Sequence, residues 1–172
     1  MDLQQATQQY DVFCDDILSL FISSVSEQGE PFASYAPFVK RGNDFFVCLS
    51  AMVRHSHNLN ATGKASILLI EDEQKASQIF ARKRLQLDCT AVREKDESIY
   101  DLFDTKFGEN ASFLRSLDDF GTYKLSVVSG SFILGFGQAY YLLEEAPTKL
   151  TTRKSSFSHS KDHDETISQN RS

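Results

Sequence analysis

The sequence lacks several short motifs that would assign it to a well-marked class. Its three cysteines, Cys14, Cys48 and Cys89, form no CxxC pair, no zinc-ligand pattern and no CxxCH motif. An odd number at such wide spacing predicts reduced thiols in the core. No GxGxxG stretch is present either, so the usual nicotinamide-binding fingerprint is absent and any electrons must come from elsewhere.

Long apolar runs and internal repeats are also missing. No segment approaches the roughly 18 uninterrupted apolar residues of a membrane span. The N-terminal stretch MDLQQATQQYDVF is polar, where a secretory signal needs a basic start and an apolar run. We therefore expect a cytoplasmic protein that does not enter the membrane. The lack of a repeat excludes solenoids and propellers.

Positive charge is scarce overall but locally concentrated. The chain has 18 Lys and Arg against 24 Asp and Glu, a net charge of -6 at pH 7. A globally negative field repels nucleic acid and anionic membranes unless a local basic groove overrides it, so we expect neither as a partner. Arg82, Lys83 and Arg84 are nevertheless adjacent, and an anionic ligand would have to be met locally, at such a cluster.

Length and composition predict one domain followed by a tail. The 172 residues are 41% hydrophobic and 24% charged, which is ordinary for a chain with a full core. Beyond Leu150 the sequence is Ser/Thr-rich and charged, with only Phe157 and Ile167 as sizeable apolar groups. Such a segment cannot bury enough surface to fold alone. We predict a domain over residues 1–150 and a polar, flexible tail over 151–172.

The domain is predicted to consist mainly of strands. Runs at 15–26, 32–39 and 45–50 are separated by the turn signals EQGEP and RGND, which favours an antiparallel meander. KASILLIEDE reads as a strand covered on both sides. RKRLQLDCTAVRE alternates apolar and polar residues, as a half-buried strand does. The stretch from FGTYK to YYLLEE reads as a hairpin that turns near Ser129-Gly130.

Fewer segments have the period of a helix. HSHNLNATG predicts a short helix that ends at Gly63, and QKASQIFA predicts about two further turns. From Asp96 onward, apolar residues recur at helical spacing, with a break at 108–110 before a second helix. Six or seven strands with few helices predict a mainly β fold, a small closed or partly open barrel.

Five segments carry a resemblance to a known family. SYAPFV, FFVCLSAMVRHSHNL, ILLIEDE, FARKRL and GFGQAY occur in this order over roughly residues 34–140. In order and spacing they resemble the heme-utilization proteins of the HugZ/HutZ type, within the pyridoxamine 5'-phosphate oxidase-like, FMN-binding split-barrel superfamily. The resemblance implies an antiparallel split barrel of six or seven strands that forms a homodimer, with ligand sites between protomers.

The superfamily offers two ligands, heme b and FMN. Its flavoenzymes typically bind the FMN phosphate with an Arg-Lys pair before a helix and with further basic residues on the second strand. Here that pair is Arg54-His55, and the strand FASYAPFV has no Arg or Lys. One arginine and a largely neutral histidine lose much of the charge-assisted bonding that a phosphate needs. We therefore expect heme b, with FMN as the weaker alternative.

The resemblance also implies roles for single residues. Arg84 matches an arginine near the oxygen-binding side of the heme, where a guanidinium could bond a ligand on the iron or a propionate. Arg54 and His55 match positions at the cleft. Asp119 matches an acid that accepts a hydrogen bond from the axial histidine of the neighbouring subunit. From the residues alone, a solvated strand face is the more common place for Arg84, His55 could be a cap or a core hydrogen-bonder, and Asp118-Asp119 could form a turn.

The axial histidine is expected in the tail, where His159 and His163 are the candidates. Histidines in such a tail are usually only solvated. We prefer His159 as the iron ligand because it follows Phe157, which could pack on a porphyrin, and we keep His163 as the alternative. The acids Glu71, Asp72 and Glu73 could pair with the cations of FARKRL or only solvate a loop.

The function implied by the resemblance is oxidative heme degradation that releases iron, with an external electron donor. Two alternatives stay open. A heme chaperone or store would hold heme without turnover, and an FMN-dependent oxidoreductase of the pyridoxamine-phosphate-oxidase type would use flavin instead.

Overall fold

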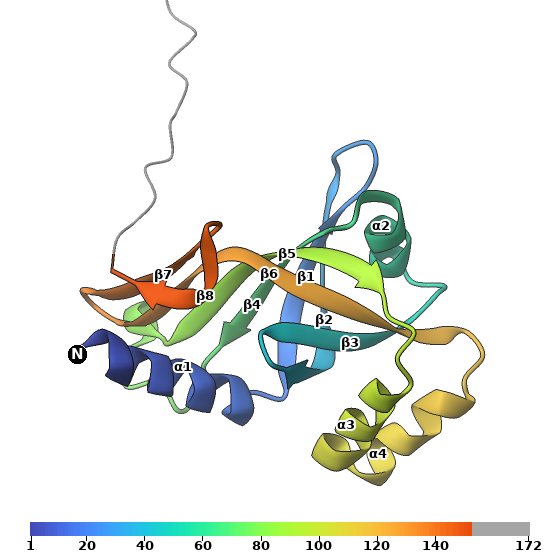
Figure 1. Cartoon of the computed structure of the whole chain (residues 1–172), viewed down its shortest axis with the longest axis horizontal. Helices are drawn as coiled ribbons and strands as arrows, with labels where there is room; N and C mark the ends of the chain where they lie inside the picture. Colours follow the sequence, from blue (N-terminus) through green and yellow to red (C-terminus); the bar gives the residue numbers. More distant parts are fainter. Residues whose placement is uncertain (153–172) are drawn as a thin grey trace, which may run out of the picture.

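The computed structural model describes residues 1–152, which form helices around one antiparallel sheet (Figure 1). The elements in chain order are α1 (Leu3–Asp16), β1 (Ser19–Val25), β2 (Pro31–Arg41), β3 (Asp44–Ser50), α2 (Arg54–Thr62), β4 (Lys64–Ile70), η1 (Ile79–Ala81), β5 (Arg84–Arg93), α3 (Ser98–Phe107), α4 (Glu109–Ser112), η2 (Phe113–Ser116), β6 (Phe120–Gly135), β7 (Gln138–Leu143) and β8 (Ala146–Thr151).

The sheet closes on itself as a six-stranded barrel. Its strands follow the order β3-β2-β1-β4-β5-β6, and β3 also pairs with β6. The long strand β6 serves two neighbours on one edge: its first half pairs with β3 from Ser50↔Phe120 onward, and its second half pairs with β7. β7 and β8 therefore extend the sheet beyond the closed part. The mainly β class and the six-stranded antiparallel split barrel are confirmed.

The predicted meander forms the first half of the barrel. β1 pairs with β2, and β2 pairs with β3, both antiparallel. β5 alternates as the sequence predicts, with Leu85, Leu87 and Cys89 buried and Asp88 exposed. Removing these side chains from water drives the closure of the barrel, at roughly 25 cal/mol for each Å² of apolar surface.

Helix α1 covers one end of the barrel and was not predicted. Asp2 and Gln5 form a reciprocal capping box at its start. The residues that it buries are spaced so that they share one face of the helix: Ala6, Tyr10, Phe13 and Cys14. The rings of Tyr10 and Phe13 each lie 5.7 Å from the ring of Phe132 in β6. Many polar residues separate these four in the sequence, so the apolar face of α1 is hard to recognise from the sequence alone.

A second apolar cluster lies outside the barrel, where α3 and the segment after it cover β2 and β3. Phe46 and Cys48 of β3 point outward and pack with Ile99 and Phe103 of α3. β3 is therefore buried on both faces. The helix predicted from Asp96 is confirmed, whereas the second helix is only a four-residue α4 followed by the 3-10 turn η2.

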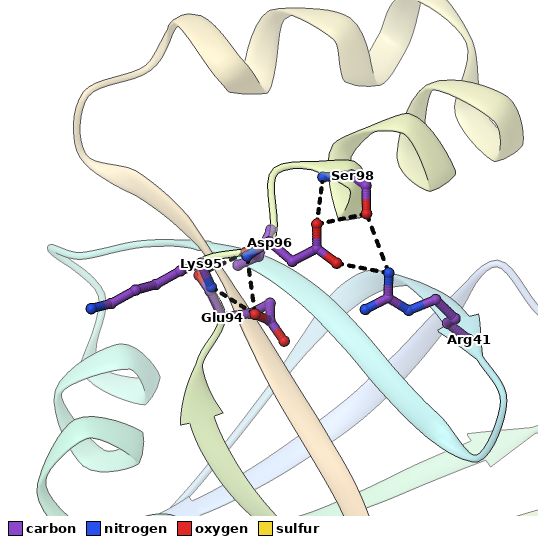
Figure 2. Close-up of polar contacts among 6 residues, drawn as sticks. Arg41, Glu94, Lys95, Asp96 and Ser98 are labelled. Carbon is purple, nitrogen blue, oxygen red and sulfur yellow. Dashed lines mark hydrogen bonds and ion pairs between the residues drawn. The ribbon is translucent and has the colours of Figure 1, made fainter.

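The start of α3 is fixed by the side chain of Asp96, as Figure 2 shows. Its carboxylate accepts bonds from the backbone and hydroxyl of Ser98, and from Nη1 of Arg41 at 2.8 Å. These bonds lower the pKa of Asp96 to about 2, and the bond from the Ser98 hydroxyl has the largest effect. Glu94 in turn binds the backbone N–H groups of Lys95 and Asp96. The helical layer is thus tied to the end of β2.

Three local predictions are wrong. The stretch 74–81 holds no α-helix: Asp72 turns the chain by accepting from the N–H of Gln74, and only η1 follows. β6 continues through Ser129-Gly130 with a bulge opposite β5, and the hairpin turns at Gly137, whose φ is +71°. At Gly130 a Cβ would collide with the backbone carbonyl oxygen of Gln86 in β5, so this glycine permits close strand packing. β4 alternates between buried and half-buried side chains instead of being covered on both faces.

The three cysteines are free and buried, as predicted. Burial raises the pKa of Cys14 and Cys89 to about 12 and that of Cys48 to about 11, so the thiols stay protonated. In residues 1–152, none of the helices has the length and apolar character needed to cross a membrane.

Candidate functional site

The first polar group of interest lies where α2 begins. His55 is buried, and its Nδ1 lies 2.5 Å from Oγ of Ser34 in β2. The ring of Phe32 meets the imidazole edge-on, with 6.5 Å between centroids. Burial lowers the pKa of His55 below its ordinary value of 6.5, so the imidazole is neutral at pH 7.

Arg54, the residue before His55, already contacts Glu30 and Phe32. Its Nη2 lies 3.2 Å from Oε2 of Glu30, and its guanidinium lies 5.0 Å from the centroid of the Phe32 ring. An ion pair and a cation–π contact of this kind hold the side chain at the surface and offset part of its charge. Arg54 and His55 together therefore offer less positive charge than their sequence suggests.

The second strand supplies no cation to this end of the barrel. Residues 31–39 contain neither Lys nor Arg, and the two cations that follow are already paired. Lys40 lies 3.5 Å from a carboxylate oxygen of Asp11, and Arg41 lies 2.8 Å from Asp96. A phosphate at the start of α2 would meet no further cation from β2.

Asp119 lies at the same end of the barrel, directly before β6. The hydroxyl of Ser50 donates to Oδ2 of Asp119 at 2.5 Å, and the N–H of Ala51 donates to its backbone carbonyl at 2.6 Å. Ser50 in turn is linked to α2, because the hydroxyl of Ser56 donates to its carbonyl at 2.7 Å. The structure thus brings Asp119, Arg54 and His55 to one turn, that between β3 and α2.

The basic cluster lies before β5, and its two arginines differ. Arg82 is held by the loop of acids: Nε and Nη2 donate to the carbonyl of Glu71, and Nη1 lies 3.0 Å from Oε1 of Glu73. Arg84 donates only to the carbonyl of Arg82, at 3.0 Å. Among the described residues, no carboxylate lies within ion-pair distance of Arg84. The acids of IEDE therefore do pair with FARKRL, but through Arg82.

Arg84 and Asp119 lie at opposite ends of one protomer. Arg84 pairs with Ile133 near the end of β6, whereas Asp119 directly precedes Phe120 at its start. The strand between them is about 40 Å long at roughly 3.3 Å per residue. Figure 1 shows β6 running from the side of α3 and α4 to that of β7. A single chain does not bring both groups to one ligand.

The outer face of the barrel between these ends carries exposed aromatic residues. Phe21 of β1 and Tyr35 of β2 are cross-strand neighbours with 54% and 65% of their surface exposed. Leu68 of β4 lies opposite Phe21 on its other side. The same side of the sheet has a shallow groove of about 470 Å³, lined mostly by apolar atoms of β1, β4 and β5 and their neighbours.

His159 and His163 lie outside the described residues, so the predicted iron ligands are not placed. Sequence reasoning missed Ser50, Ser34 and Phe32, which hold the residues that it did select. Ser50 ends the strand FFVCLS directly before the predicted helix, and this position was the one available signal for it.

Comparison with known proteins assigns the chain to a family. Residues 6–133 match the family described as pyridoxamine 5'-phosphate oxidase. The chain belongs to this family. Within it, the chain is 41% identical over 127 residues to the heme oxygenase HutZ of Vibrio cholerae serotype O1, a match that covers 71% of this chain and 72% of HutZ.

Solved structures agree with this assignment. The crystal structure of Vibrio cholerae HutZ, there named a heme storage protein, has a TM-score of 0.66 and 36% identity, covering 74% of this chain and 91% of HutZ. Campylobacter jejuni ChuZ has a TM-score of 0.79 and 28% identity, covering 88% of this chain and 63% of ChuZ. The family member is thus of the HutZ type, and the resemblance found in the sequence is confirmed.

Proposed function

We propose that this protein binds heme b between two protomers and degrades it oxidatively, with an external electron donor, so that iron is released. The observation that carries the proposal is the 41% identity, over 127 residues, to a relative named heme oxygenase. Ser50, Arg84 and Asp119 all lie within residues 6–133, the part of the chain that matches the family.

The charges at the start of α2 favour heme over FMN. A flavin phosphate would meet Arg54, which already pairs with Glu30, and a neutral His55. β2 adds no cation over residues 31–39. Since a phosphate dianion depends on charge-assisted bonds, this end of the barrel suits it poorly. Heme depends less on cations because its iron binds a protein ligand and its two propionates can remain in solvent.

The described residues supply groups that suit a flat, apolar ligand with carboxylates. Arg84 has a guanidinium with no acid partner in the described part of the chain, so it can donate to a propionate or to a ligand on the iron. Asp119 has Oδ2 bonded to Ser50 and can accept an imidazole N–H at Oδ1. When heme is bound, its iron supplies the oxygen chemistry. The chain binds and orients the heme and excludes water from the site.

A homodimer would bring these groups together. Arg84 and Asp119 are separated by most of β6 within one protomer. One protomer would therefore supply Arg84 and the other Asp119 to the same heme. The exposed Phe21 and Tyr35 and the half-buried Leu68 beside them form an apolar face of the kind that marks an interface between proteins. We propose that the two protomers meet through this outer face.

The remaining parts of the proposal concern the axial ligand and the compartment. We propose His159 as the iron ligand, with His163 as the alternative, and Asp119 of the other protomer as its hydrogen-bond acceptor. Three free cysteines fit a reducing compartment, so we place the reaction in the cytoplasm.

A hemin titration followed by reduction tests the function. The purified protein should give a Soret band with added hemin, and the band should disappear when ascorbate is added under air. A band that persists would support storage, a second candidate favoured by the name given to the HutZ crystal structure. Protein that is purified with stoichiometric flavin and does not take up hemin would contradict both.

A pair of substitutions tests the axial ligand. Replacing His159 and His163 together by alanine should change the absorption spectrum of the ferric complex, because iron would lose its nitrogen ligand. The single variants then show which histidine is used. An unchanged spectrum in the double variant would exclude both.

A further inference from the structure

We infer that Ser50 is a positioning residue for the heme site, acting through Asp119. Its hydroxyl donates to Oδ2 of Asp119 at 2.5 Å, and in the described part of the chain no other hydrogen bond reaches that carboxylate. This inference rests on the proposed function, since it assumes that Asp119 accepts a bond from an axial imidazole.

The contacts around Ser50 make it a fixed reference point. Its backbone pairs with Phe120 in the barrel, and its carbonyl accepts from the hydroxyl of the fully buried Ser56. Its own hydroxyl accepts from the N–H of Met52 at 3.2 Å. With that acceptor direction taken, the hydroxyl hydrogen is directed to Asp119.

The consequence for Asp119 is a carboxylate with one oxygen bonded and one available. The N–H of Ala51 also holds the backbone of Asp119 at 2.6 Å, so both the main chain and the side chain are tied to the β3–α2 turn. A carboxylate held in this way keeps Oδ1 in one direction without an entropy cost when a ligand arrives. Oδ1 is then the oxygen that would bind an imidazole N–H.

Loss of the hydroxyl should therefore resemble, in part, loss of the carboxylate. An imidazole that loses its acceptor becomes a weaker donor of electrons to iron, which raises the ferric/ferrous midpoint potential of bound heme. Asp119→Asn should raise it and weaken hemin binding about 10-fold. Ser50→Ala should shift the potential in the same direction by less, and weaken hemin binding about threefold.

The variants are compared by hemin affinity and by the midpoint potential of the bound heme. Ser50→Thr keeps the hydroxyl and should stay near wild type. Ser98→Ala is the matched control, because it removes another serine–aspartate bond, 2.7 Å to Asp96 at the start of α3, in which Asp119 takes no part (Figure 2). Ser50→Cys, with a similar size and a much weaker donor, replaces the alanine variant if that variant does not fold.

The outcomes separate the inference from the proposed function. A shift in Asp119→Asn together with an unchanged Ser50→Ala, or a Ser50→Thr as defective as Ser50→Ala, overturns the role of Ser50 and leaves heme binding in place. Wild-type protein that takes up no hemin overturns the proposed function, and the inference with it.

Discussion

The two ends of the barrel hold their polar groups in opposite ways. At the β3–α2 turn, Asp119 is bonded to Ser50, and His55 is bonded to Ser34. At the start of β5, the acceptor found for Arg84 within residues 1–152 is a carbonyl, and the nearby carboxylate of Glu73 binds Arg82. One end offers a carboxylate in a fixed position, and the other offers a cation that has no acid partner among residues 1–152.

The difference shows that the number of charges does not identify a ligand-binding residue. Arg82 and Arg84 are two positions apart, yet the first closes a loop and the second remains available. Under the proposed function, each end would supply half of a site.

The largest effect should come from separating the two protomers. Phe21→Glu places a charge in the exposed apolar face, so the dimer should dissociate and hemin affinity should fall at least about 100-fold. Sedimentation velocity measures the oligomeric state, and hemin titration measures the affinity. Val12→Glu on α1 is the control, since Val12 is 55% exposed and Phe21 54%. A Phe21→Glu variant that remains dimeric with full affinity would refute the proposed face.

The next effect concerns the end with the free cation. Arg84→Gln should lower the rate of heme degradation about 100-fold, because it removes a charged donor from the ligand. Lys83→Gln removes a neighbouring charge and should change the rate less than about twofold. The decay of the Soret band after ascorbate is added gives the rate. Equal losses in both variants would mean that only the local potential matters.

A smaller effect concerns acid stability at the other end. The pKa of His55 is lowered by burial, so below its ordinary value of 6.5 the unfolded chain binds a proton that the folded chain does not. The free energy of unfolding should therefore fall on acidification from about pH 7.5 to about pH 5.5, and His55 can contribute at most the slope of one proton, about 1.4 kcal/mol per pH unit.

Urea unfolding of His55→Gln at both pH values isolates this contribution, because the variant should lose that part of the pH dependence. His57→Gln changes an exposed histidine of the same helix and serves as the control. Identical pH dependence in wild type and His55→Gln would show that folding does not shift the pKa of His55.

The smallest effect concerns the residual affinity for flavin. Glu30→Gln frees Arg54 from its ion pair, so FMN affinity should rise by no more than about fivefold at low salt, the range of an exposed pair. Quenching of flavin fluorescence measures it, with Glu27→Gln as the control in the same turn. A rise to tight binding would mean that Glu30 alone excludes FMN.

The sequence predicts those parts of the fold that depend on local pattern. The alternation of Leu85, Leu87 and Cys89 predicts β5, and Gly63 predicts the end of α2, where its φ is +63°. It fails where a local signal has two readings. Ser129-Gly130 has the composition of a turn, yet Gly130 is needed because β5 packs too closely for a side chain.

The candidate site is only half predictable for a related reason. Arg84, His55 and Asp119 follow from the motifs, but the groups that hold them do not. Ser50 and Asp119 are 69 positions apart, and they meet because β3 pairs with β6 in one register. A contact of this kind depends on closure of the whole barrel, which no short window of sequence contains.

The hydroxyl of Tyr140 in β7 donates to the carbonyl of Met1, at 3.2 Å, so the first residue is tied to the sheet extension. An affinity tag fused ahead of Met1 would start beside β7 and β8. If residues beyond 152 supply the iron ligand, a polyhistidine tag at this position would compete with them. Tag-free protein is therefore the right material for spectroscopy, and a tagged preparation would give a false coordination signal.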